Sequence, residues 1–319
     1  MMDFEIMHVV EPGKSRDSSS INVNLSSEFN RKKYLNGYGK HLESPNNNRS
    51  ITSTSQHIPI IDLEHSIDSI WTERTKLNPR LFNGTKFRIH NVTDSVTTIG
   101  QVEFYLGVSD YKEFIGTNWS PHSEYLQKQG MISYGNSQAF LSDALGVGAS
   151  VVTSNKKLIL LKRSHHCAEA PSMWDVPGGH AEPSQIIGEK RLEEIDVTSM
   201  SNQSVLHEIF DSITREVVDE VNIPGILLSR PLYMGTHRNL LSAGRPSLAF
   251  VIKCDLTSDE VQTLYKQGSQ IEADETTNIM FLPIDSVAAL TQDRNDIWES
   301  FAPSAKGNLT TFCIAHGLR

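Results

Sequence analysis

Four charged residues crowd the end of one predicted helix. Over residues 206–221 the apolar residues repeat with helical spacing, which predicts an amphipathic helix. Arg215, Glu216, Asp219 and Glu220 occupy its last two turns, and the three carboxylates converge because residues three or four apart share a face. The helix dipole makes carboxylates unfavourable near a C-terminus. Such a cluster favours a bound cation, and hard oxygen ligands suit Mg²⁺ or Mn²⁺.

A simpler interpretation of this helix is a solvated charged face with Arg215 as local ion-pair partner. A second pattern favours the metal site. Residues 175–182 read Asp-Val-Pro-Gly-Gly-His-Ala-Glu, and Gly178 and Gly179 let the backbone approach a ligand closely. A Gly-Gly pair alone is a weak signal, but joined to the carboxylate helix it is a strong one.

These segments resemble the signature of the Nudix hydrolases, G-x5-E-x7-R-E-U-x-E-E-x-G-U, where U is a bulky aliphatic residue. Residues 215–223 follow its second half, with Asp219 in place of a Glu and Asn222 in place of the Gly. Asn tolerates the left-handed backbone that ends many helices, so that exchange is physically reasonable.

The first half of the signature departs from the family. Arg215 follows Gly179 by 36 residues where the signature has 14, which leaves 22 extra residues. His207 stands where the family has its first Glu, and Glu208 is next to it. That Glu is therefore missing, or its role has moved.

A signature split in this way resembles one subfamily, the UDP-glucose and UDP-galactose diphosphatases of animals. The resemblance extends over about residues 58 to 313 and includes motifs outside the signature. These motifs are Pro79-x-Leu81-Phe82 with Lys86-Phe87-Arg88, Gly116-Thr-Asn-Trp-Ser120, Leu-Gly-Val-Gly-Ala at 145–149, Ala168-Glu-Ala-Pro171, Ser242-Ala-Gly-Arg245 and Pro303-Ser-Ala-Lys-Gly307.

The resemblance implies Mg²⁺-dependent hydrolysis of a UDP-sugar to UMP and a sugar 1-phosphate, with Mn²⁺ as an alternative metal. It implies that Glu216 and Glu220 bind the metal and that, with Arg215 and Asp219, they form the catalytic set. The residues that it implies contact the UDP-sugar are Phe82, Tyr111, Arg163, Ala168, Asp175, His180 and Glu182. The general base is open among Asp219, Glu208, Glu272, Asp274 and Glu275.

Each implied contact is chemically reasonable. Phe82 and Tyr111 suit the faces of uracil, Arg163 suits the diphosphate, and the polar residues Asp175, His180 and Glu182 suit sugar hydroxyls. Taken alone, the two aromatic residues would more often be core residues, Arg163 a surface charge and His180 a solvated loop residue.

The apolar pattern predicts the elements that position these residues. Strands are predicted over 87–92, 102–108, 145–152, 157–162, 231–235, 248–255 and 279–284, and further helices over 110–115, 121–129 and 258–266. Residues 4–10 and 21–25 predict a hairpin, and the polar residues 36–57 predict a mobile insertion.

The expected fold class is α/β (α+β), with a mixed sheet between helices as in the Nudix α/β/α sandwich. Its predicted domains are a smaller N-terminal α+β domain over residues 1–140 and a Nudix hydrolase domain over 141–319.

The composition and the N-terminal sequence limit the classes of binding partner that this chain is expected to have. The net charge of −9 and the lack of a basic patch argue against nucleic acid. Neither a membrane helix nor a secretory signal is predicted, because no apolar run is long enough and residues 1–11 carry Asp3 and Glu5. Three widely spaced cysteines predict no disulfide framework. We expect a small-molecule substrate and a cytoplasmic location, with the nucleus and the oligomeric state left open.

Two alternative functions stay open. One is a Nudix hydrolase of another nucleoside diphosphate, such as ADP-ribose. The other is a non-catalytic Nudix module that binds a nucleotide sugar, an interpretation that the missing early Glu supports and the metal pair opposes.

Overall fold

Two sheets form the framework of the chain in this computed structural model, which describes residues 3–42, 59–79, 81–268, 270–271, 275–293 and 295–318. The strands of the larger sheet are β1 (Phe4–Val9), β5 (Gly146–Val152), β6 (Lys157–Arg163), β7 (Trp174–Asp175), β8 (Gly178–His180), β9 (Leu232–Asn239), β10 (Arg245–Lys253) and β11 (Thr276–Pro283). Their order is β1-β9-β10-β5-β6-β11, with β8 paired to β5 and β7 to β6. Among the strand pairs of this sheet in the described residues, β5 and β10 are parallel and the others are antiparallel.

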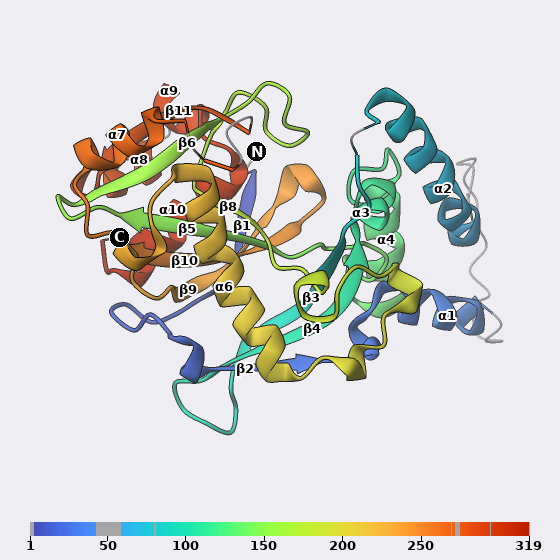
Figure 1. The fold of residues 1–319 in the computed structure, drawn as a ribbon. Coiled ribbons are helices and arrows are strands. Elements are labelled where there is room, and N and C mark those ends of the chain that lie inside the picture. Colours follow the sequence, from blue (N-terminus) through green and yellow to red (C-terminus); the bar gives the residue numbers. More distant parts are fainter. Residues whose placement is uncertain are drawn as a thin grey trace.

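The smaller sheet has the order β2-β4-β3 and lies beside the larger one (Figure 1). Its strands are β2 (Ile21–Leu25), β3 (Thr85–Asp94) and β4 (Val102–Asp110). The hairpin predicted at the N-terminus is therefore wrong, because β1 pairs with β9 and β2 with β4. The apolar residues of both strands do face a core, but the partners come from distant parts of the chain, which local pattern does not encode.

Helices surround both sheets (Figure 1). Those near the smaller sheet are α1 (Arg31–Leu42), α2 (Ile60–Leu77), α3 (Tyr111–Thr117) and α4 (Ser123–Tyr134). Those near the larger sheet are α6 (Asn202–Val221), α7 (Ser258–Lys266), α8 (Ile284–Asp293), α9 (Asp296–Glu299) and α10 (Pro303–Ala315), and α5 (Ser184–Ile187) packs against α6. Residues 36–42 of the predicted mobile insertion belong to α1, and residues 43–57 lie outside the described residues. None of the helices in the described residues is long and apolar enough to cross a membrane.

The larger sheet is covered on both faces, by α6 and by α10. On one face, Val147 of β5 is paired with Gly179, and the lack of a side chain at Gly179 makes room for Glu216 of α6. The residue after Val147, Gly148, lies close to Asn308 of α10. Side chains alternate between the faces of a strand, so these neighbours identify opposite faces. The chain thus has the mixed α/β sandwich expected from the sequence.

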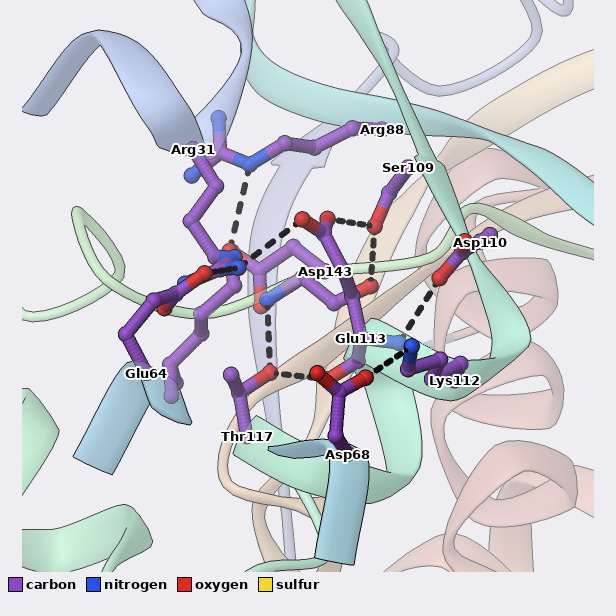
Figure 2. Close-up of polar contacts among 12 residues, drawn as sticks. Arg31, Glu64, Asp68, Arg88, Ser109, Asp110, Lys112, Glu113, Thr117 and Asp143 are labelled. Carbon is purple, nitrogen blue, oxygen red and sulfur yellow. Dashed lines mark hydrogen bonds and ion pairs between the residues drawn. The ribbon is translucent and has the colours of Figure 1, made fainter. Parts of the chain in front are cut away.

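A buried ion pair joins the helices of the N-terminal part. Arg31 of α1 is 2% exposed, and its guanidinium contacts Glu64 of α2 at 2.5 Å and Glu113 of α3 at 2.8 Å. Figure 2 shows this guanidinium between the two carboxylates, with Ser109 of β4 bonded to Glu113. The pair fixes α3, the helix that begins with Tyr111.

Candidate active site

The carboxylate helix forms as the sequence predicts. The hydroxyl of Ser201 caps its first turn by accepting from the backbone of Ser204 at 3.0 Å. Most of its apolar residues are buried, and Ile209, Ile213 and Val217 are fully so. Asn222 ends the helix with φ 67° and ψ 30°, so the left-handed ending predicted for this Asn is confirmed.

Glu216 and Glu220 hold the short strand β8. The backbone N–H of Gly178 donates to Glu220 Oε2 at 2.8 Å, and that of His180 donates to Glu216 Oε1 at 3.3 Å. A Cβ at Gly179 would lie only 1.9 Å from Glu216 Oε1, so only glycine allows the carboxylate this position. The Gly-Gly motif and the carboxylate helix are therefore one structural unit, as their pairing in the sequence predicted.

Glu208, one position after the place where the signature has its early Glu, contacts Arg215. Arg215 Nη2 donates to Glu208 Oε1 at 2.7 Å, and the same oxygen accepts the backbone N–H of Glu182 at 3.1 Å. Burial raises the pKa of Glu208, and the Arg215 guanidinium opposes that shift. His207 is exposed and contacts Gln203 instead. Glu208 therefore makes the ion pair with Arg215, and Asp219 lies half-buried on the same helix.

A cleft of about 410 Å³ opens beside β8. Five of the predicted substrate contacts line it, namely Tyr111, Arg163, Ala168, Asp175 and His180. Among the described residues, Phe82 and Glu182 do not belong to this lining. Phe82 is 66% exposed, and Glu182 forms an ion pair with Lys86. Glu216 and Glu220 do not line the cleft either; they bond to the β8 backbone that does.

Asp175 is a buried acid in the wall of this cleft. Its Oδ2 accepts from Ser304 Oγ of α10 at 2.7 Å and lies 3.8 Å from Arg163 Nη1. Burial raises its pKa, although the guanidinium acts in the opposite direction. Arg163 Nε also donates to the carbonyl of Glu169 at 2.9 Å. This hydrogen bond and the contact with Asp175 therefore orient Arg163, the residue predicted to bind the diphosphate.

His180 is held as a neutral imidazole. Arg245 Nη1 lies 3.2 Å from His180 Nε2. A guanidinium can only donate, so Nε2 accepts and the ring proton resides on Nδ1. Burial, helped by the charges of Lys86, Arg245 and Arg163, lowers the pKa of His180 well below its usual range.

Several cleft residues had no role in the sequence prediction. Arg245 forms an ion pair with Glu169 at 3.1 Å, and Glu169 also accepts from Asn239 and Ser242, both at 2.8 Å. The other unassigned polar or aromatic residues of the lining include Trp119, His237, Ser304 and Asn308. Trp119, Arg245 and Ser304 belong to motifs noted in the sequence. Those motifs were recognised, but no chemical role was predicted for these three residues.

The general-base candidates have different surroundings. Glu208 is already engaged by Arg215 and by the backbone of Glu182. Glu275 lines the cleft, and Asp219 is half-buried on α6. Glu272 and Asp274 lie outside the described residues.

Comparison with known proteins found no matching family model. Two curated relatives cover most of the chain. The human uridine diphosphate glucose pyrophosphatase NUDT22 is 40% identical over 263 residues, which cover 81% of this chain and 84% of the relative. Nudix hydrolase 9 of Arabidopsis thaliana is 35% identical over 239 residues, which cover 72% of this chain and 75% of the relative.

Among solved structures, the MutT protein of Methanosarcina mazei Go1 is similar over 53% of this chain and 91% of its own, with 14% identity and a TM-score of 0.31. The two curated relatives carry the assignment, because each shares more than a third of its aligned residues with this chain over most of both lengths. The chain belongs to the Nudix hydrolase family.

Proposed function

We propose that this enzyme hydrolyses the diphosphate bond of a UDP-sugar, yielding UMP and a sugar 1-phosphate, with UDP-glucose and UDP-galactose as substrates. The name of the human relative supports this substrate. The observation that carries the proposal is the cleft itself, which has aromatic rings such as Tyr111 at one wall and Arg163, Asp175 and His180 among its polar residues.

We assign the metal to Glu216 and Glu220, with Mg²⁺ as the ion and Mn²⁺ as the alternative. Among the residues that the structure describes, no three His, Cys, Asp or Glu side chains are arranged to hold a metal. A pair of carboxylates still fits Mg²⁺, which usually takes one or two carboxylates and completes its shell with water and substrate phosphate. When bound, the ion neutralises the diphosphate and orients it.

The reaction requires a water molecule to attack one phosphorus and a base to take its proton. Asp219 and Glu275 are the described carboxylates that remain candidates for this base, since Glu208 is engaged by Arg215. Cleavage of the bond to the bridging oxygen then releases UMP and the sugar 1-phosphate.

The substrate contacts are proposals of the same kind. Arg163 would bind the diphosphate, because its guanidinium matches phosphate oxygens. Asp175, His180 and Glu182 would read sugar hydroxyls, and Ala168 would line the site. Tyr111 would contact the uracil, with Phe82 approaching from the rim beside the cleft-lining Leu81.

Two alternatives are weighed against this proposal. The ion pair of Glu208 with Arg215 argues against a non-catalytic module, because the sequence reason for such a module was the missing early Glu. ADP-ribose carries a purine nucleobase where a UDP-sugar carries uracil. A pocket shaped to stack uracil should exclude the larger purine by steric clash.

Product identification tests the proposal. The full chain is incubated with Mg²⁺ and UDP-glucose, UDP-galactose, ADP-ribose or GDP-mannose, and the products are separated by ion exchange. Release of UMP and sugar 1-phosphate from both UDP-sugars is expected. Faster turnover of ADP-ribose than of UDP-glucose would contradict the uracil site while leaving the carboxylate helix as a hydrolase centre.

We also propose a boundary between two domains at about residue 140. The strand β1 precedes this boundary in the sequence but pairs with β9 of the larger sheet. Cys167 and Cys254 are free thiols, which supports a cytoplasmic location because reducing compartments keep thiols free.

A further inference from the structure

One wall of the cleft is aromatic. Tyr111, Phe114 and Trp119 line it, and they come from α3 and the turn that follows it. Phe114 is 3% exposed, whereas Tyr111 and Trp119 are half-buried. The ring centroids of Phe114 and Trp119 are 4.8 Å apart, and those of Tyr111 and Phe114 are 6.1 Å apart. Phe114 therefore backs a continuous wall whose exposed parts are Tyr111 and Trp119.

The two exposed rings of this wall meet at a corner. The planes of Tyr111 and Trp119 are inclined by 73°, and their centroids are 6.5 Å apart. A planar aromatic ligand that stacks on one ring presents its edge to the other, and both contacts are favourable geometries for aromatic groups. A corner of this kind fits one flat ring.

A hydrogen bond to Ser242, in the turn between β9 and β10, fixes Trp119 in place. The indole Nε1 donates to Ser242 Oγ at 3.1 Å, and Ser242 Oγ donates to Glu169 Oε1 at 2.8 Å. Indole has no other polar hydrogen, so the ring offers a ligand its face. A ring oriented before the ligand arrives lowers the ordering cost of binding.

The same chain of contacts leads to the polar residues of the cleft. Glu169 forms an ion pair with Arg245, and Arg245 contacts His180. The carbonyl of Glu169 also accepts from Arg163. The cleft therefore offers an aromatic surface and cationic groups within one bonded framework, which matches a nucleotide that carries a base and a diphosphate.

We propose that Trp119 is a substrate-binding residue that stacks on the nucleobase, with Tyr111 as the second side of the corner. This inference rests on the proposed hydrolysis of a UDP-sugar. It adds a ring that the sequence prediction did not assign and that lines the cleft, whereas the exposed Phe82 does not.

Trp119→Leu and Trp119→Phe form a matched pair, because both keep apolar bulk but only Phe keeps an aromatic face. For Trp119→Leu we expect the KM for UDP-glucose to rise about fivefold or more, as for a lost base–aromatic stack. The kcat should change less than about twofold, since the base is remote from the reacting phosphorus. Trp119→Phe should stay within about threefold of the wild-type KM, because stacking tolerates any aromatic face.

Tryptophan fluorescence provides a direct readout with UMP as the probe. UMP should quench the wild-type emission, and Trp119→Phe should remove most of that quenching. Trp298→Phe is the control, because Trp298 is 3% exposed and does not line the cleft. Melting temperatures show whether each variant folds. If Trp119→Leu does not fold, Ser242→Ala replaces it, since it keeps the ring but removes the tether and should raise the KM two- to threefold, about the effect of one hydrogen bond.

The outcomes separate the two proposals. An unchanged KM in the folded Leu or Ser242→Ala variant, or full quenching in Trp119→Phe, overturns the role of Trp119 while UDP-glucose hydrolysis stands. Quenching that depends on Trp119 without any release of UMP from UDP-glucose contradicts the hydrolase function and supports the base site. A wild-type chain that binds no UMP overturns the base site.

Discussion

Glu208 and Arg215 form an ion pair of 2.7 Å across two turns of α6. Seven residues complete almost two whole helical turns, so the two side chains share a face, whereas the position eight before Arg215 is rotated by about 80° from Arg215. His207 holds that rotated position and is exposed. Glu208 also accepts the backbone N–H of Glu182, so the pair ties α6 to the chain that leaves β8.

Glu208→Gln tests whether this pair supports the site. We expect kcat to fall at least about tenfold, because the end of β8 loses a charged anchor. The free energy of unfolding should fall by only about 1 kcal/mol, since Arg215 is 43% exposed and water screens the pair. His207→Gln is the control and should behave as wild type in turnover and urea unfolding. Equal losses in both variants would contradict the role given to Glu208.

Glu216→Gln and Glu220→Gln test the proposed metal pair. Each removes one anionic ligand and keeps an oxygen that accepts the β8 backbone N–H, so turnover should fall more than tenfold, or about 1.4 kcal/mol, at saturating Mg²⁺. Melting temperatures should stay close to wild type. Asp211→Asn is the control, because Asp211 is exposed on the same helix. Retention of more than about a tenth of the rate would show that the assigned site is wrong.

Arg31→Met should destabilise the fold strongly. The change leaves Glu113 buried without its guanidinium partner, and removing one member of a buried pair typically costs about 3–5 kcal/mol. The ion pair of Lys33 with Glu28 is exposed, so Lys33→Met should cost less than about 1 kcal/mol. Urea unfolding measures both. Similar costs would mean that water or a rearranged side chain compensates Glu113.

His237 should make stability fall in acid. Burial lowers its pKa to about 3, while in the unfolded chain it titrates near 6.5. Between these values the unfolded chain binds more protons, so this contribution is complete above pH 6.5 and is lost as the pH falls toward 3. It amounts to about 2 kcal/mol between pH 7 and 5.

His237→Gln lacks this titration, so its unfolding free energy should decrease less between pH 7 and 5 than that of the wild type. Carboxylates contribute equally to both proteins and cancel in the comparison. His207→Gln, at an exposed position, should keep the wild-type dependence. An identical pH dependence in His237→Gln and wild type would show that the folded chain protonates this ring as readily as the unfolded chain does, because water reaches it.

The sequence alone determined the local features with strong periodicity or a distinctive motif. The carboxylate helix, its Asn222 ending and most central strands could be predicted because apolar spacing and cap chemistry act over a few residues. The sequence motif predicted that the Gly-Gly segment, which forms β8, and the helix α6 belong to one site. It did not predict the hydrogen bonds from the backbone of Gly178 and His180 to the two carboxylates.

Tertiary structure decided the features that depend on distant partners. The helix α10 was missed because it is buried nearly all round, with Lys306, Asn308 and Thr311 inside, so it has no amphipathic face. The strand β1 joined β9 instead of forming a local hairpin. Trp119, Glu169 and Arg245 were also unassigned, because only the packing of α3, the loop after β6 and the start of β10 brings them to one cleft.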